Sequence, residues 1–168
     1  MMDSMSIELV PISFSDSSVL RHLMQLYLYD FSEFTESDVN HHGLFEYLFL
    51  DNYWTEPERY PFLIKVDEHT AGFVLVRKLT DDNGATVHAI SEFFVLRKYR
   101  RKKVGKQAAF SAFDRFPGHW HVSEINENVS AQKFWRQIIG EYTHGRYKEI
   151  RTEADTVIVQ LFNSLEKK

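Results

Sequence analysis

The stretch VLRKYRRKKVGK, residues 95–106, begins as a strand-like run, crosses a basic loop and enters an expected helix. Six of the seven residues in 97–103 are lysine or arginine. The first N–H groups of a helix have no intrahelical partner and carry partial positive charge, so an anion binds there readily. Gly105 also lacks the Cβ that would hold a ligand away from the backbone. These features predict a phosphate-binding loop, with a solvated run of charges as the alternative interpretation.

The charge of the whole chain limits what this loop could bind. The net charge is −4, and without the six loop bases the chain has 14 basic and 24 acidic residues, a net charge of −10. A small positive area on an acidic protein favours a small anionic ligand over an extended polyanion. Nucleic acid is therefore not the expected partner of the loop.

Length and composition are those of one globular domain, and we expect residues 1–168 to form it. Apolar residues make up 43% of the chain and charged residues 26%, as in ordinary soluble proteins. No run of 18 apolar residues predicts a membrane span, and residues 1–5 lack the basic and apolar regions of a signal peptide. The absence of cysteine excludes disulfides, thiolate catalysis and zinc-thiolate sites. We expect a cytoplasmic protein.

Hydrophobic periodicity and turn signals predict alternating strands and helices. The expected strands are 7–12, 61–66, 71–78, 86–96, 119–125, 142–150 and 155–162. The expected helices are one that follows an N-cap at 15–17 and three over 44–52, 103–116 and 128–139, the last ending at a C-cap glycine, Gly140. Turn or loop signals lie at 35–43, 67–69 and 81–84. This order predicts an α/β (α+β) fold, a mixed sheet with helices on both faces.

Residues 95–105 resemble the signature of the GNAT N-acetyltransferase superfamily, in which a strand valine leads into an Arg/Gln-x-x-Gly-x-Gly/Ala turn. Arg100 matches the first position of that turn and Gly105 the last. Lys103 stands where the family usually has its middle glycine, although lysine retains the N–H that a backbone phosphate site needs. The resemblance implies the GNAT acyl-CoA acyltransferase fold, with a central, mostly antiparallel mixed sheet, and acetyl-CoA as the acyl donor.

Residues 128–135, NVSAQKFW, resemble the second motif of the family, Asn-x-x-Ala followed by Phe-Tyr and a glycine, here Gly140. The resemblance implies that Asn128 contacts the pantetheine arm or adjoining groups of the cofactor. A plain helix N-cap is the alternative, and both roles are compatible. Trp135 occupies the position at which many members carry a tyrosine proposed as general acid. An indole N–H cannot fill that role, so it is absent or has moved, and a core aromatic is the other interpretation of Trp135.

Acyl transfer to an amine needs a base to remove a proton and a donor to the tetrahedral oxyanion. The resemblance implies that a backbone N–H near Phe94 or Val95 is this donor. We predict Glu92 as the base, because it lies three residues before Val95 on the expected strand. Alternation along the strand places Glu92 and Phe94 on one face. A surface or ion-paired carboxylate is the alternative interpretation of Glu92.

The remaining site assignments follow from the two motifs. No metal is expected, because His119 and His121 share a strand face but have no evident third ligand, and GNAT transfer requires no metal. His121 and Glu124 stay as alternative bases. The predicted cofactor contacts are Phe94, Val95, Arg100, Arg101, Lys102, Lys103, Val104, Gly105, Lys106, Asn128 and Trp135.

The acceptor is less defined than the donor. Aromatic residues are concentrated between residues 27 and 54, and we expect most of them in the core. Those that face the cleft, with Asp30, Glu33 and Glu46, predict a site for a small cationic amine. Two alternatives stay open: a regulatory module that binds acyl-CoA without transferring the acyl group, and an acetyltransferase that acts on a protein or on aminoacyl-tRNA. The assembly also stays open and includes a homodimer.

Overall fold

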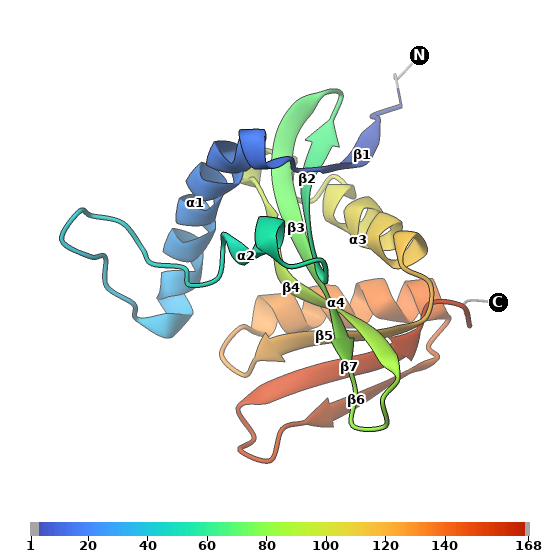
Figure 1. Ribbon diagram of the computed structural model, residues 1–168. Coiled ribbons are helices and arrows are strands. Elements are labelled where there is room, and N and C mark those ends of the chain that lie inside the picture. Colours follow the sequence, from blue (N-terminus) through green and yellow to red (C-terminus); the bar gives the residue numbers. More distant parts are fainter. Residues whose placement is uncertain (1–3, 167–168) are drawn as a thin grey trace.

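One seven-stranded sheet, ordered β1-β2-β3-β4-β5-β7-β6, runs through the protein (Figure 1). The computed structural model describes residues 4–166; residues 1–3, on which part of the signal-peptide argument rests, lie outside this range. The strands are β1 (Ile7–Pro11), β2 (Arg59–Val66), β3 (His69–Thr80), β4 (Thr86–Val95), β5 (His119–Ile125), β6 (Tyr147–Arg151) and β7 (Val157–Asn163). The helices are α1 (Ser17–Thr35), α2 (Asn52–Thr55), α3 (Val104–Arg115) and α4 (Val129–Thr143), with 3-10 turns at Phe14–Asp16 and Arg97–Tyr99.

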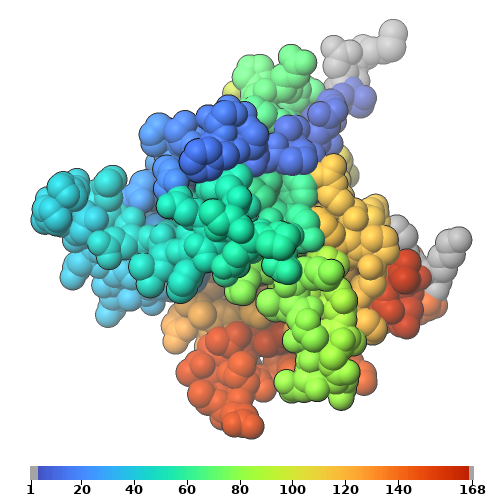
Figure 2. All heavy atoms as spheres, viewed as in Figure 1, coloured from blue at the N-terminus to red at the C-terminus, as the bar shows by residue number. Residues whose placement is uncertain are grey.

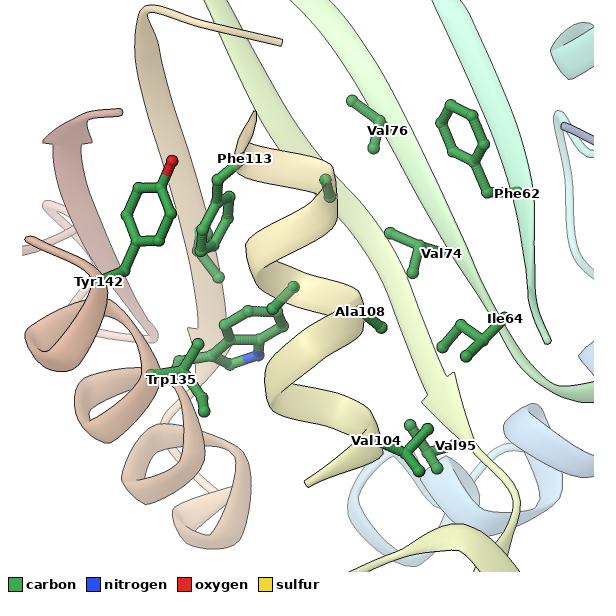
Figure 3. Close-up of a cluster of buried hydrophobic side chains, with 14 of the residues drawn as sticks. Phe62, Ile64, Val74, Val76, Val95, Val104, Ala108, Phe113, Trp135 and Tyr142 are labelled. Carbon is green, nitrogen blue, oxygen red and sulfur yellow. The ribbon is translucent and has the colours of Figure 1, made fainter. Parts of the chain in front are cut away.

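Helices cover both faces of the sheet, as the sequence predicted. α1 and α2 pack on one face, where Leu20, Leu23 and Met24 of α1 are buried against β2, β3 and β4. α3 and α4 pack on the other face in a larger cluster that includes Phe113 and Trp135 (Figure 3). Such burial of apolar area is the main stabilising contribution to a fold of this kind. The predicted mixed α/β (α+β) fold is confirmed. Among residues 4–166 no helix is long and apolar enough to cross a membrane.

The sheet is mostly antiparallel. The parallel strands β4 and β5 are hydrogen-bonded to each other over only part of their length. β4 pairs with β5 only from Val87 to Ile90, opposite His119 to Val122. Beyond these residues both strands continue without pairing to each other, while β4 stays paired with β3 as far as Val95. Backbone groups on the β5 side of the end of β4 are thus outside the ladder. An extended ligand could bond to such groups as an added strand does.

The predicted helix over residues 44–52 is wrong. Residues 36–51 form a long segment that Figure 2 shows, with α1, as a blue-to-cyan lobe on one side of the molecule. The Gln25 side chain accepts a hydrogen bond from the Phe45 N–H and donates one to the Phe45 carbonyl, which takes the place of helical bonding. Phe49 has a left-handed φ of 64°, which a right-handed helix excludes. Only Asn52–Thr55 is helical, because residues 44–51 bond to distant parts of the chain, through Gln25 of α1 and Glu92 of β4.

Gly140 is not the C-cap of α4, which continues to Thr143. The buried face of the helix extends through Ile138, Ile139 and Tyr142, and this burial outweighs the cost of about 1 kcal/mol for a glycine in a helix. The C-cap is His144, whose φ of 53° is left-handed. The strand predicted to start at Tyr142 therefore begins at Tyr147. In the hairpin between β2 and β3, the turn is shorter than predicted, and His69 already belongs to β3.

Candidate active site

The loop between β4 and α3 has a backbone geometry that is suited to binding an anion. Arg101 and Lys103 have left-handed φ values of 60° and 62°, with Lys102 between them. Alternating backbone conformations of this kind turn successive N–H groups toward one side. α3 starts after Lys103 with no side-chain cap and no acidic residue in its first turn. The positive φ also explains why a glycine suits the position of Lys103, since a side chain there costs about 1 kcal/mol.

Asp30 on α1 neutralises part of the charge on this loop. It accepts hydrogen bonds from Arg97 at 2.9 Å and from Arg100 at 2.8 Å. Burial raises the pKa of Asp30, but the two guanidinium groups outweigh burial and bring the pKa below its usual range. Arg100 also donates through Nε to the Val95 carbonyl at 2.7 Å. The loop is thereby tied both to the end of β4 and to α1.

A cavity of about 640 Å³ lies between this loop, α1 and the first turns of α4. Its walls combine aromatic rings with the guanidinium groups of Arg97, Arg100 and Arg101. The end of β4, which is not paired with β5, also lines this cavity. Seven of the predicted cofactor contacts are brought together here: Phe94, Val95, Arg100, Arg101, Gly105, Asn128 and Trp135.

The other four predicted contacts do not line this cavity. The Val104 side chain is fully buried and lies against Val95 in Figure 3, so only its backbone is available to a ligand. Lys106 forms an ion pair with Glu141 of α4 and lies over the Phe110 ring. Lys102 and Lys103 are exposed on the loop. Their charges act on a bound anion through the local potential, which weakens with added salt.

Three residues at the α3–α4 side of the cavity have packing roles. The Asn128 side chain accepts a hydrogen bond from the Ala131 N–H at 3.1 Å, so it is the N-cap of α4. Trp135 is only 5% exposed and packs edge-on against Phe93 of β4, with centroids 4.9 Å apart. It is therefore a core aromatic that also forms part of the cavity wall. A Cβ on Gly105 would lie 3.2 Å from the ring of Phe134, which makes this glycine a packing requirement between the helices.

A second cavity, of about 610 Å³, lies beside the first, between α1 and residues 35–47. Tyr27 and Phe31 line both cavities, so these two spaces adjoin. Among the described residues that line the second cavity are the carboxylates Asp38, Glu46 and Glu92, and none is lysine, arginine or histidine. The first cavity is lined by three arginines and also by Asp30 and Glu33, whereas the charged residues of the second are all carboxylates. Of the three acidic residues expected beside an amine, only Glu46 lies in the second cavity.

Glu92 lies in this second cavity, held by two tyrosines. The Tyr27 hydroxyl donates a hydrogen bond to Oε2 of Glu92, and the Tyr47 hydroxyl donates to Oε1 at 3.2 Å. Burial raises the pKa of Glu92, and the two hydroxyls partly offset this by bonding to the charged form. Burial first, and then the Glu92 carboxylate, raises the pKa of both tyrosines. The sequence indicates the two tyrosines only as members of a general aromatic set, since nothing local links them to Glu92.

The other residues of that aromatic set are distributed more widely than expected. Tyr53 is buried at 3% exposure, whereas Tyr29 and Phe49 are more than 60% exposed. The expectation that most of the set lies in the core is therefore wrong. Tyr27, Phe31, Phe34, Phe45 and Tyr47 instead line the two cavities.

The alternative bases lie away from both cavities. His121 on β5 is partly buried, which lowers its pKa, and it lines neither cavity. Glu124 is 6% exposed on the sheet face that α4 covers, and burial raises its pKa to about 7. No cluster of three metal-ligating side chains occurs within residues 4–166. Glu92 is the candidate that borders the cavity system.

Comparison with known proteins adds sequence and structural relatives. A sequence model described as the acetyltransferase (GNAT) family matches residues 21–140. A search of curated proteins finds no significant match. An acetyltransferase from Thermus thermophilus has a TM-score of 0.66 at 14% identity over 94% of this chain and 97% of its own. Arabidopsis thaliana NAA60 in complex with acetyl-CoA has a TM-score of 0.61 at 14% identity, over 94% of this chain and 98% of its own. The aminoglycoside acetyltransferase AAC(6')-Ib in complex with coenzyme A has a TM-score of 0.67 at 10% identity, over 96% of each chain. At these identities the structures show a shared fold.

Proposed function

This chain belongs to the acetyltransferase (GNAT) family, and we propose that it transfers the acetyl group of acetyl-CoA directly to the primary amine of a small cationic acceptor. The observation that carries the proposal is the adjacency of two unlike cavities. One has an anion-binding loop and arginines, and the other has a buried carboxylate; Tyr27 and Phe31 line both. Such a pair can hold an anionic donor and an amine acceptor side by side, which converts their reaction into an effectively unimolecular step.

The first cavity suits acetyl-CoA. The start of α3 and the N–H groups of the preceding loop would hold the pyrophosphate, with Arg101 adding a charge-assisted contact. The pantetheine arm would lie along the end of β4, where backbone groups of Phe94 and Val95 are outside the ladder with β5. When bound, acetyl-CoA supplies the activated thioester. Asn128 and the aromatic wall would orient the arm toward the second cavity.

The second cavity suits a cationic amine. Its carboxylates attract an ammonium group, and its aromatic faces at Phe31, Phe45 and Tyr47 can bind the alkyl part and the charge. Amine acetylation requires the neutral amine, and Glu92 is the carboxylate in position to remove a proton. Its raised pKa makes it a stronger base than an exposed glutamate. Glu92 is therefore the proposed catalytic base, and residues 1–168 are proposed to act as one acetyltransferase domain.

The test has a binding part and a turnover part. Calorimetric titration with acetyl-CoA should show saturable binding; no binding at millimolar concentration would refute the cofactor assignment. A panel of mono-, di- and polyamines is then screened for release of the CoA thiol. Glu92→Gln should lower kcat by about 100-fold or more and leave acetyl-CoA affinity unchanged. Glu153→Gln, on the exposed turn before β7, is the matched control and should behave as the wild type.

A further inference from the structure

The two cavities pose a problem of proton transport. Glu92 lines the second cavity and does not line the first, where the thioester of the proposed donor would lie. Its carboxylate would receive the amine proton, yet the departing thiolate needs a proton on the other side. Two residues line both cavities, Tyr27 and Phe31, and of these only Tyr27 has an exchangeable proton. We propose that Tyr27 is a catalytic residue that carries the proton from Glu92 to the thiolate, an inference that rests on the proposed acetyl transfer.

The Tyr27 ring is held firmly at the border between the cavities. It contacts Phe73 and Phe94 edge-on, with centroids 5.7 and 5.8 Å apart, and stacks on Phe31 at 5.7 Å. Phe94 belongs to the part of β4 that lines the first cavity. The Tyr27 hydroxyl, at the far end of the ring, is fixed by its hydrogen bond to Glu92 Oε2. The hydroxyl is therefore fixed next to the base, at the end of a ring that lines both cavities.

The proton balance is counted from the neutral amine; the proton that Glu92 takes from the ammonium form passes to solvent before the attack. From that point no other reactant is required. As the amine nitrogen bonds to the acetyl carbon, its N–H bond breaks and an O–H bond forms on Glu92. The hydrogen bond between the two side chains then reverses, so Glu92 donates its proton to the Tyr27 oxygen. Tyr27 releases its original proton to sulfur as the C–S bond breaks. The products are the amide and the free thiol of CoA, with Glu92 ionised and Tyr27 protonated as at the start.

Burial supports a carrier role over a base role for Tyr27. The hydroxyl lies in a poorly solvated place next to a carboxylate, and both effects raise its pKa above the usual range of tyrosine. It is therefore protonated at every working pH and can give up a proton only when it receives another. Within residues 4–166, Glu92 is the carboxylate to which the Tyr27 hydroxyl is hydrogen-bonded. Transfer through Tyr27 is thus coupled to proton uptake by the base.

Tyr47 is a matched control in the same site. Its hydroxyl also donates to Glu92, but it lines only the second cavity. Tyr47→Phe should weaken the positioning of Glu92 without affecting protonation of the leaving group. The comparison of Tyr27→Phe with Tyr47→Phe therefore separates a proton carrier from a group that only orients the base.

The experiment varies the leaving group of the acyl donor. With acetyl-CoA, Tyr27→Phe should lower kcat by about 100-fold or more, within the range for loss of a general acid. With 4-nitrothiophenyl acetate, whose thiolate leaves without protonation, the loss should be less than about threefold. Tyr47→Phe should lose the same factor with both donors. Equal losses with both donors for Tyr27→Phe, or no loss with acetyl-CoA, would overturn the inference and leave the proposed acetyl transfer standing.

A second measurement requires no substitution at Tyr27. Single-turnover rates of the wild type with acetyl-CoA are measured in mixtures of H₂O and D₂O. Two protons in flight give a curved dependence on deuterium fraction, and one proton gives a linear one, which would contradict the relay. If the wild type transfers no acetyl group to any amine, the proposed function fails first and the inference fails with it. Calorimetry with CoA and the thermal midpoint of Tyr27→Phe exclude a loss of folding as the cause of its slow turnover.

Discussion

Arg100 of the β4–α3 loop donates a hydrogen bond to Asp30 of α1 at 2.8 Å, and these two residues are 70 positions apart in the chain. Asp30 thereby competes with a bound anion for the guanidinium group. This relationship means that the arginine is not free to give its full charge to a phosphate. The affinity of the loop for CoA should consequently depend on α1 as well as on the loop itself.

Asp30→Asn should increase the affinity for CoA. The change removes one negative charge beside Arg97 and Arg100, and an ion pair of this exposure is worth about 1 kcal/mol or less. We expect the Kd to fall up to about fivefold at low salt, with a steeper dependence on salt, as measured by calorimetry. Asp51→Asn removes a similar carboxylate from the Arg21 pair outside both cavities and should leave the Kd unchanged. A weaker affinity in Asp30→Asn would instead mean that Asp30 positions Arg100 for the phosphate.

Lys103→Gly should stabilise the protein or leave its stability unchanged. Lys103 has φ 62° and ψ 8°, and a left-handed residue with a side chain costs about 1 kcal/mol, which glycine avoids. Lys102 has no left-handed φ, so Lys102→Gly should lower the free energy of unfolding, by about 0.5–1 kcal/mol. Urea unfolding of both variants measures the difference. If both variants lose stability equally, the left-handed conformation at Lys103 is wrong.

Gly105→Ala should weaken acetyl-CoA binding through Phe134. The new Cβ would lie 3.2 Å from that ring, which lines the first cavity and must then shift. We expect a several-fold rise in Kd, and Phe134→Leu in the same chain should reverse most of it. Gly140→Ala is the control in α4, because its Cβ would meet the Tyr147 ring at an ordinary 3.9 Å. That change should add up to about 1 kcal/mol of helix stability and leave the Kd unaltered. An unchanged Kd in Gly105→Ala would show that contact with Phe134 does not affect acetyl-CoA binding.

Glu124→Gln should remove part of the pH dependence of stability. Both Glu124 carboxyl oxygens are buried without a hydrogen-bond partner among residues 4–166, and burial raises the pKa to about 7. The folded protein therefore keeps a proton that the unfolded chain releases near pH 4.3. Because the folded state binds more protons between these pH values, the free energy of unfolding falls as pH rises through this window, by on the order of 3 kcal/mol.

Urea unfolding at pH 5 and pH 8 tests this prediction for Glu124. The glutamine variant should lose less stability than the wild type between the two conditions and should be the more stable protein at pH 8. The difference between variant and wild type isolates this group, because Glu92 also has a raised pKa. Glu127→Gln changes an exposed carboxyl next to the end of β5 and should keep the wild-type slope. Equal slopes for Glu124→Gln and the wild type would show that Glu124 is ionised in the folded protein.

Much of the fold could be predicted because its signals are local. The strands before residue 126 and α3 follow alternation, periodicity and strong turn signals, and they lie within a few residues of their predicted limits. The error at residues 44–52 has a different cause. That segment is rich in aromatic and leucine residues, but the Gln25 side chain binds the backbone of Phe45 from 20 positions away. A tertiary contact of this kind leaves no pattern in the segment itself.

The sequence by itself determined the family and placed together the residues of the proposed donor site. The residues of the loop before α3 and the start of α4 are contiguous, so helix-start N–H groups, basic side chains and an N-cap can be recognised where they stand. The acceptor side was decided only by tertiary structure. Glu92 meets Tyr27 and Tyr47 from 65 and 45 positions away, and the sheet opens only where β4 and β5 part. Packing of distant segments sets which groups share a cavity, and therefore their solvation, their pKa values and the route that a proton can take.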